Sequence, residues 1–116
     1  MLINPRRGEI WWVNFDPIVG SEITKTRPAV VLDHGHPTLG LRIVAPITDW
    51  KSNYAKSIAK VHLQATAMNG LSKDSAADAY QIKTVSLERF TRKLGILPQA
   101  TVDEVAAAVA TLIDAP

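Results

Sequence analysis

The stretch EIWWVNF at residues Glu9–Phe15 decides the fold. Five apolar side chains alternate between the two faces of an extended strand, Trp11, Val13 and Phe15 on one face and Ile10 and Trp12 on the other. A strand that is apolar on both faces belongs at the centre of a sheet or in the wall of a barrel. We therefore expect Trp11 to lie in the core. For Trp12 two positions remain, one in the core and one with the ring exposed.

Outward from this stretch, short apolar runs are separated by Gly, Pro, Asn or Asp at intervals of about 8–12 residues, which is typical of a small antiparallel sheet. Further strands are predicted at residues 28–32, 41–47, 57–63 and 75–85. Pro28 is expected to open its strand, because proline is excluded from a strand's middle. Pro46 and Thr48 are expected to close the next strand, and Ser86 to cap a short helical turn through Phe90.

The last residues differ in kind. Thr101 and Glu104 have the spacing of a capping box, which predicts a helix over about 101–114. Its apolar residues form one stripe, made of Val102, Val105, Val109, Leu112 and Ile113. One amphipathic helix packed on a small barrel gives an α+β fold. The expected organisation is one domain over 1–116, with the barrel over about 7–95.

Composition excludes several classes of protein. The 116 residues include no Cys, which rules out disulfide scaffolds, thiolate catalysis and Cys-ligated zinc. No apolar run approaches the roughly 18 residues of a membrane span, and the N-terminus lacks the order of a signal peptide, so we expect a cytoplasmic protein. The net charge is +2, but all 13 Lys and Arg residues lie between residues 6 and 93. This basic body permits a polyanionic partner without requiring one.

Few residues suggest chemistry by themselves. His34 and His36 could form a ligand pair, but a catalytic metal usually needs three protein ligands, and no second cluster stands out. Together with His62 they are better interpreted as unrelated surface or packing residues. Arg27 precedes a proline, which stiffens its backbone and suits its planar fork to bidentate phosphate capture. Thr48, at a strand end, could donate to a phosphoryl oxygen. From these residues alone, an ordinary surface arginine and a strand-ending threonine remain the better interpretation.

An ordered series of short motifs changes the interpretation of Arg27 and Thr48. They are RGEIWWV at 7–13, DP at 16–17, GSE at 20–22, TRPAVV at 26–31, PIT at 46–48, DS at 74–75 and QIKTV at 81–85. In this order and spacing they closely resemble the MazF/PemK family of bacterial type II toxins, over roughly residues 6–95. The resemblance implies an SH3-like antiparallel β-barrel of the CcdB/PemK type that works as a homodimer.

The resemblance also implies an activity: a sequence-specific, metal-independent endoribonuclease with no cofactor, cutting single-stranded RNA, chiefly mRNA, to leave 2′,3′-cyclic phosphate and 5′-hydroxyl ends. Translation and growth would stop. A cognate antitoxin would bind the dimer, block the RNA groove and reach operator DNA as the toxin–antitoxin complex.

The family's motifs assign roles to residues of this chain. The catalytic Arg and Thr fall on Arg27 and Thr48. The RNA-binding positions fall on a further set, Ser21, Glu22, Trp12, Gln81 and Lys83. Several members carry an acidic residue just before the Gln of the QIK segment, proposed in one branch as the general base. This chain has Tyr80 there, so the base is Glu22, Asp78 or neither.

Two other readings belong to different functional classes. A non-enzymatic toxin of the CcdB type would act by binding DNA gyrase, and would have no need of Arg27 or Thr48. The other alternative is a catalytically silent RNA-binding barrel. Tyr80 is compatible with it, because an acidic residue proposed as the general base is missing at that position. An Arg27→Ala variant separates them, because it should abolish toxicity only if Arg27 performs chemistry or grips RNA.

Overall fold

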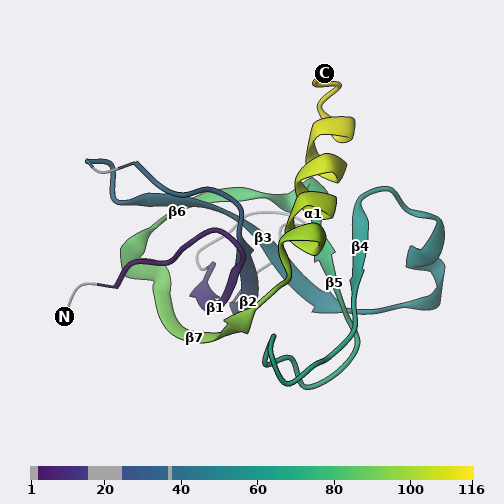
Figure 1. Ribbon diagram of the computed structural model, residues 1–116, viewed down its shortest axis with the longest axis horizontal. Helices are drawn as coiled ribbons and strands as arrows, with labels where there is room; N and C mark the ends of the chain where they lie inside the picture. Colours follow the sequence, from purple (N-terminus) through teal and green to yellow (C-terminus); the bar gives the residue numbers. More distant parts are fainter. Residues whose placement is uncertain (1–2, 16–24, 37) are drawn as a thin grey trace.

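A computed structural model describes residues 3–15, 25–36 and 38–116, and Figure 1 shows the arrangement. Seven strands, three short 3₁₀ turns and one helix follow one another along the chain: β1 (Glu9–Asn14), β2 (Thr26–Val31), β3 (Leu41–Asp49), η1 (Ser52–Lys56), β4 (Lys60–Leu63), β5 (Ser75–Asp78), η2 (Ala79–Gln81), β6 (Lys83–Ser86), η3 (Leu87–Arg89), β7 (Phe90–Ile96) and α1 (Gln99–Leu112). None of the helices in this part of the chain is long and apolar enough to cross a membrane.

All pairings are antiparallel, in the order β4-β5-β3-β2-β1-β7, with β6 added on β3. The predicted α+β fold with an antiparallel sheet and a C-terminal helix is confirmed. The sheet curls like a barrel (Figure 1), yet among the described strands β4 and β7 remain two separate ends, so the ring is not closed.

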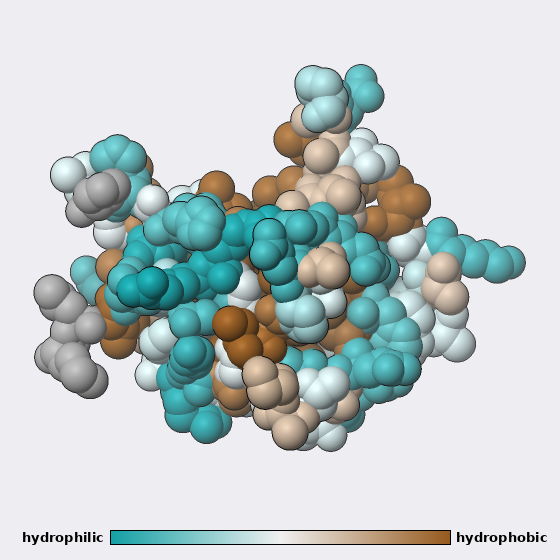
Figure 2. All heavy atoms as spheres, viewed as in Figure 1, coloured by the Kyte–Doolittle hydropathy of each residue, from teal (hydrophilic) through white to brown (hydrophobic). Residues whose placement is uncertain are grey.

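Each face of the sheet centre is buried in its own apolar cluster. Ile10 and Val30 belong to a cluster that includes Val102 and Val105 of α1. Trp11 belongs to the other cluster, where its ring meets that of Phe90 edge-on at 5.8 Å. Burial of β1 on both faces and the core position of Trp11 are therefore confirmed. On the face seen in Figure 2, hydrophobic residues gather around α1 and hydrophilic residues cover β6.

Two prolines lie inside strands, contrary to the sequence prediction. Pro28 is the third residue of β2, which begins at Thr26 and pairs Pro28 with Trp12 of β1. The pairing of β2 with β3 begins only at Ala29, so Pro28 has a ladder on one side. Pro46 lies within β3, at the point where that strand exchanges one neighbour for another. Neither proline needs to donate a hydrogen bond there.

The other predicted strands were only partly right. The segment 57–63 is a strand only from Lys60, and 75–85 is two strands separated by the η2 turn, which the Asp78 carboxylate caps at the N–H of Tyr80. Ser86 caps the turn that follows, as predicted. Strand β7 was not foreseen, because the segment FTRKLGI at 90–96 carries charges instead of a clear alternation.

The predicted capping box is wrong. Helix α1 begins at Gln99, two residues before Thr101, and Pro98 precedes it without a side-chain cap. The Pro98 carbonyl accepts from the N–H groups of Thr101 and Val102, so proline rather than threonine sets the start. Val102 and Val105 are buried as predicted, but Ile113 lies beyond the helix and is 68% exposed.

Glu9 is a buried carboxylate that ties the start of β1 to β7. Its Oε1 accepts from the indole N–H of Trp11 at 3.0 Å and from the Arg6 N–H at 2.9 Å, and Lys93 lies 2.9 Å from Oε2. Burial alone would raise the pKa of Glu9, but these hydrogen bonds and the Lys93 charge outweigh it and hold the pKa below the ordinary 4.5. Ionised Glu9 therefore stabilises the fold.

Glu9→Gln should lower the free energy of unfolding at pH 7 by about 1–2 kcal/mol, because charge-assisted hydrogen bonds become neutral ones. The folded-state pKa is depressed, so this stabilisation is present above pH 4.5 and is lost as the pH falls through the folded value. Urea unfolding of both proteins from pH 7 down to 3 measures it. A gap between them that stays constant over this range would contradict the account.

Candidate functional site

A cavity of about 620 Å³ opens where β1, β2, β3 and β7 meet the loop before β5. Its wall contains both residues to which the motifs assign catalysis, and Trp12. The lining residues are Trp12, Lys25, Thr26, Arg27, Pro28, Ile47, Thr48, Asp49, Gly70, Leu71, Ser72, Lys73, Ser75, Arg92 and Leu94.

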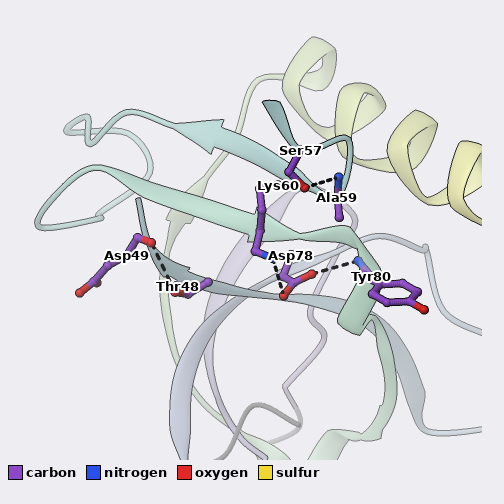
Figure 3. A network of polar contacts seen from close by, with 7 residues as sticks. All are labelled: Thr48, Asp49, Ser57, Ala59, Lys60, Asp78 and Tyr80. Carbon is purple, nitrogen blue, oxygen red and sulfur yellow. Dashed lines mark hydrogen bonds and ion pairs between the residues drawn. The ribbon is translucent and has the colours of Figure 1, made fainter. Parts of the chain in front are cut away.

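Arg27 and Thr48 lie on neighbouring strands, and both line the cavity. Arg27 is the second residue of β2, and Thr48 is the last but one of β3. The β2–β3 ladder ends at the pair Ala29–Pro46, two residues short of each. Both residues are partly exposed. The Thr48 hydroxyl makes one long hydrogen bond, 3.4 Å to the carbonyl of Asp49 (Figure 3), and such a weak bond leaves it able to turn to a ligand.

The described part of the cavity wall is strongly basic. It carries four cationic side chains, Lys25, Arg27, Lys73 and Arg92, and one carboxylate, Asp49. Lys73 and Asp49 form an ion pair at 3.1 Å, with both side chains mostly exposed. The remaining charge is positive, so the cavity attracts anions.

The loop before β5 is fixed by one buried side chain. Asn69 is 3% exposed, and its Oδ1 accepts from the N–H groups of Thr66 and Leu71 while its Nδ2 donates to the carbonyl of Gln64. Next to it, Gly70 has φ +71°, and a Cβ there would collide with the carbonyl oxygen of Leu94 in β7. This close approach seats the loop against the sheet and completes the cavity.

The remaining candidate residues that the structure describes lie outside the cavity lining. Ser21 and Glu22 lie outside the described residues. Gln81 and Lys83 are partly buried in η2 and β6 and do not line it. Asp78 is 2% exposed, 3.4 Å from Lys60 Nζ and 3.0 Å from the N–H of Tyr80 (Figure 3), so its carboxylate is already engaged.

The three histidines are not brought together as a group. His62 stacks on Trp50, with ring centroids 4.0 Å apart, and its Nε2 is 3.3 Å from Asp74. His36 Nδ1 contacts the Thr38 hydroxyl at 3.0 Å. Within the described ranges, no three His, Asp or Glu residues are grouped so that they could hold a metal ion.

Sequence reasoning missed three cavity cations, Lys25, Lys73 and Arg92. Lys25 adjoins the TRPAVV motif and Arg92 lies beyond the last quoted motif, and no spacing along the chain marks either as functional. Lys73 directly precedes the quoted DS segment at 74–75, and its ion pair with Asp49 appears only in the fold. The signal that could have found them is the strand pairing itself.

Comparison with solved structures defines the class of fold. MazF from Deinococcus radiodurans superposes with a TM-score of 0.81 at 25% identity, covering 97% of this chain and 98% of that one. A mycobacterial structure described as an endoribonuclease in complex with its cognate antitoxin gives 0.72 at 16% identity, with 97% of each chain covered, and supports the fold alone. The protein thus has the fold of MazF toxins.

Sequence comparison shows the family itself. The chain belongs to the PemK-like, MazF-like toxins of type II toxin–antitoxin systems, whose family model matches residues 6–113. Endoribonuclease MazF9 of Mycobacterium tuberculosis is 40% identical over 97 residues, which are 78% of this chain and 80% of the relative. Endoribonuclease EndoA of Bacillus subtilis is 31% identical over 103 residues, 86% of each chain.

The seating of the loop has a matched test, because Gly40 has φ +62° but no atom within 4 Å of its missing Cβ. Both Gly→Ala variants carry the same left-handed strain, and only Gly70→Ala adds the collision with Leu94. Gly70→Ala should therefore unfold about 1–3 kcal/mol more easily than Gly40→Ala in urea. Equal stability of the two variants would mean that the loop does not depend on this contact.

Proposed function

We propose that this protein is the toxin of a type II toxin–antitoxin system and an endoribonuclease that cleaves single-stranded RNA, chiefly mRNA, at short preferred sequences. The observation that carries the proposal is that Arg27 and Thr48 both line one basic cavity. Family membership and relatives named as endoribonucleases support the same reaction.

The reaction uses the substrate's own nucleophile. The 2′-oxygen of one ribose attacks the adjacent phosphorus, the 5′-oxygen of the next nucleotide leaves, and the products are a 2′,3′-cyclic phosphate and a 5′-hydroxyl. The nucleophile is already beside its target, and this proximity lowers the activation barrier without a metal-bound water. The protein has to hold the chain, stabilise the charged phosphorane and move two protons.

Arg27 and Thr48 supply the stabilisation. The Arg27 guanidinium neutralises the non-bridging oxygens, and the Thr48 hydroxyl donates to one of them. An arginine side chain keeps its proton near neutrality, so electrostatic stabilisation is its main role and proton donation is secondary. Because Asp78 is held by Lys60 and a backbone N–H, Glu22 is the carboxylate we favour as general base.

The partners follow from the family. The active form is a homodimer that binds single-stranded RNA in the cytoplasm. A cognate antitoxin protein covers the RNA groove, and operator DNA is reached only through that complex. Solved MazE–MazF complexes from D. radiodurans have the same fold as this chain at TM-scores of 0.75 and 0.76. Ser21, Gln81 and Lys83 remain proposed RNA contacts.

Incubation with a long single-stranded RNA in excess EDTA should yield fragments with cyclic-phosphate and 5′-hydroxyl ends. Arg27→Ala and Thr48→Val should each lower the cleavage rate by about 10²–10³-fold, because each removes a donor aimed at the phosphorane.

Arg6→Ala is the matched control, since Arg6 is an exposed arginine outside the cavity, and its rate should stay at the wild-type level. RNA of varied sequence that survives the wild-type protein would contradict the proposal. A gyrase-binding assay would then test the CcdB-like reading.

A further inference from the structure

Trp12, which lines the cavity, has a buried indole donor with no acceptor among the described residues. The indole N–H of Trp12 is shielded from solvent and forms no hydrogen bond to any described residue. Trp11 beside it behaves differently, donating its own indole N–H to Glu9 at 3.0 Å. A buried donor without a partner costs free energy that a native fold rarely leaves uncompensated.

The neighbour of Trp12 across the ladder is Arg92. The β1–β7 register pairs these two residues, so their side chains share one face of the sheet, and both line the cavity. The Arg92 side chain is exposed, and its guanidinium makes no hydrogen bond or ion pair with another side chain or carbonyl of the described residues. Lys93, the next residue, forms an ion pair with Glu9 at 2.9 Å. Of the two cations of β7, Lys93 therefore has a carboxylate partner among the described residues and Arg92 does not.

Arg92 and Arg27 both line the cavity, from strands on either side of β1. Arg27 lies on β2 and Arg92 on β7, the two neighbours of β1. Two strand spacings place their backbones roughly 10 Å apart. In the two ladders of β1, Arg92 lies opposite Trp12 and Arg27 lies opposite Val13. Two guanidinium groups on the wall of one cavity, starting this far apart, suit two successive groups on an extended polyanion.

We propose that Arg92 and the Trp12 N–H form a second phosphodiester subsite, which holds the RNA phosphate next to the scissile one. This inference rests on the proposed function. Arg92 supplies the charge and a planar fork, and the indole N–H donates to a phosphate oxygen that enters the cavity. The subsite positions the strand, whereas Arg27 and Thr48 act on the reacting phosphorus.

Trp12→Phe separates this role from a structural one. The substitution removes the N–H and keeps an aromatic ring. Loss of an unsatisfied buried donor should leave the melting temperature of the free protein unchanged or raise it. The same change should weaken RNA binding. A residue with a purely structural role would instead lower the melting temperature and leave RNA affinity as it was.

The test uses an oligoribonucleotide that contains the cleavage sequence mapped with the wild type. Arg92→Ala should raise KM about tenfold with kcat within about twofold, since it loses one charge-assisted contact made equally in ground and transition states. The slope of log affinity against log salt should fall in magnitude by about 0.7. Arg92→Lys should recover part of KM, and Trp12→Phe should raise it about threefold or more with kcat unchanged.

Arg6→Ala controls for loss of an arginine charge outside the cavity and should move neither KM nor the salt slope. An Arg92→Ala protein with wild-type KM and salt slope would overturn the proposal, as would a Trp12→Phe protein with wild-type KM. A wild type that binds the oligoribonucleotide without cutting it would overturn the proposed function alone. The dissociation constants and salt slopes of the variants would still decide the subsite.

Discussion

The site depends on the pairing of strand β3, because this one strand pairs with β6 over its first half and with β5 over its last residues. Along one edge it pairs with β6 over residues 41–44 and with β5 over residues 47–49, while β2 occupies its other edge. Pro46 lies at the change of neighbour, where the ladder needs no N–H donor on that side. The strand therefore continues past the proline and carries Thr48 to the wall of the cavity.

The position of Arg27 follows from the same pairing. Register in an antiparallel ladder is strongly specified in a packed core, because a slip by one residue moves every side chain to the opposite face and into the other cluster. Ala29 and Val30 of β2 are fully buried on opposite faces, so β2 has no freedom to slide on β3. Core packing at a distance from the chemistry thus fixes the two strands that carry Arg27 and Thr48 to the cavity.

The sequence predicted what periodicity and motif order encode. The two-faced strand at Glu9–Phe15, the core position of Trp11 and the C-terminal helix all follow from local patterns, and the family follows from ordered motifs. The strand that contains Pro46 was predicted to end too early, at residue 47 instead of 49. Whether a strand tolerates a proline depends on which strands lie beside it, and the sequence does not give these neighbours. The helix start was misplaced, because Pro98 sets it by backbone geometry while Thr101 only has the composition of a cap.

The candidate site likewise contains residues that the sequence revealed and residues that only the structure revealed. Arg27 and Thr48 were found through motifs, and the cavity contains both. Arg92 was missed because no spacing along the chain relates it to Trp12, which lies 80 residues away and meets it only through the β1–β7 ladder. Asp78 looked available as a base in the sequence, and only the structure shows its carboxylate held by Lys60. Composition does not record which polar groups are already engaged.

The central claim is that the cavity stabilises an attack made by the RNA's own 2′-oxygen. The most direct measurement is cleavage, in excess EDTA, of an oligoribonucleotide in which the nucleotide 5′ to the mapped scissile phosphate is replaced by its 2′-deoxy counterpart. The account predicts that this oligonucleotide stays intact and still binds, competing with the unmodified strand at a similar concentration. Cleavage of the 2′-deoxy strand at the same bond would contradict it, because the nucleophile would then have to come from water or from the protein.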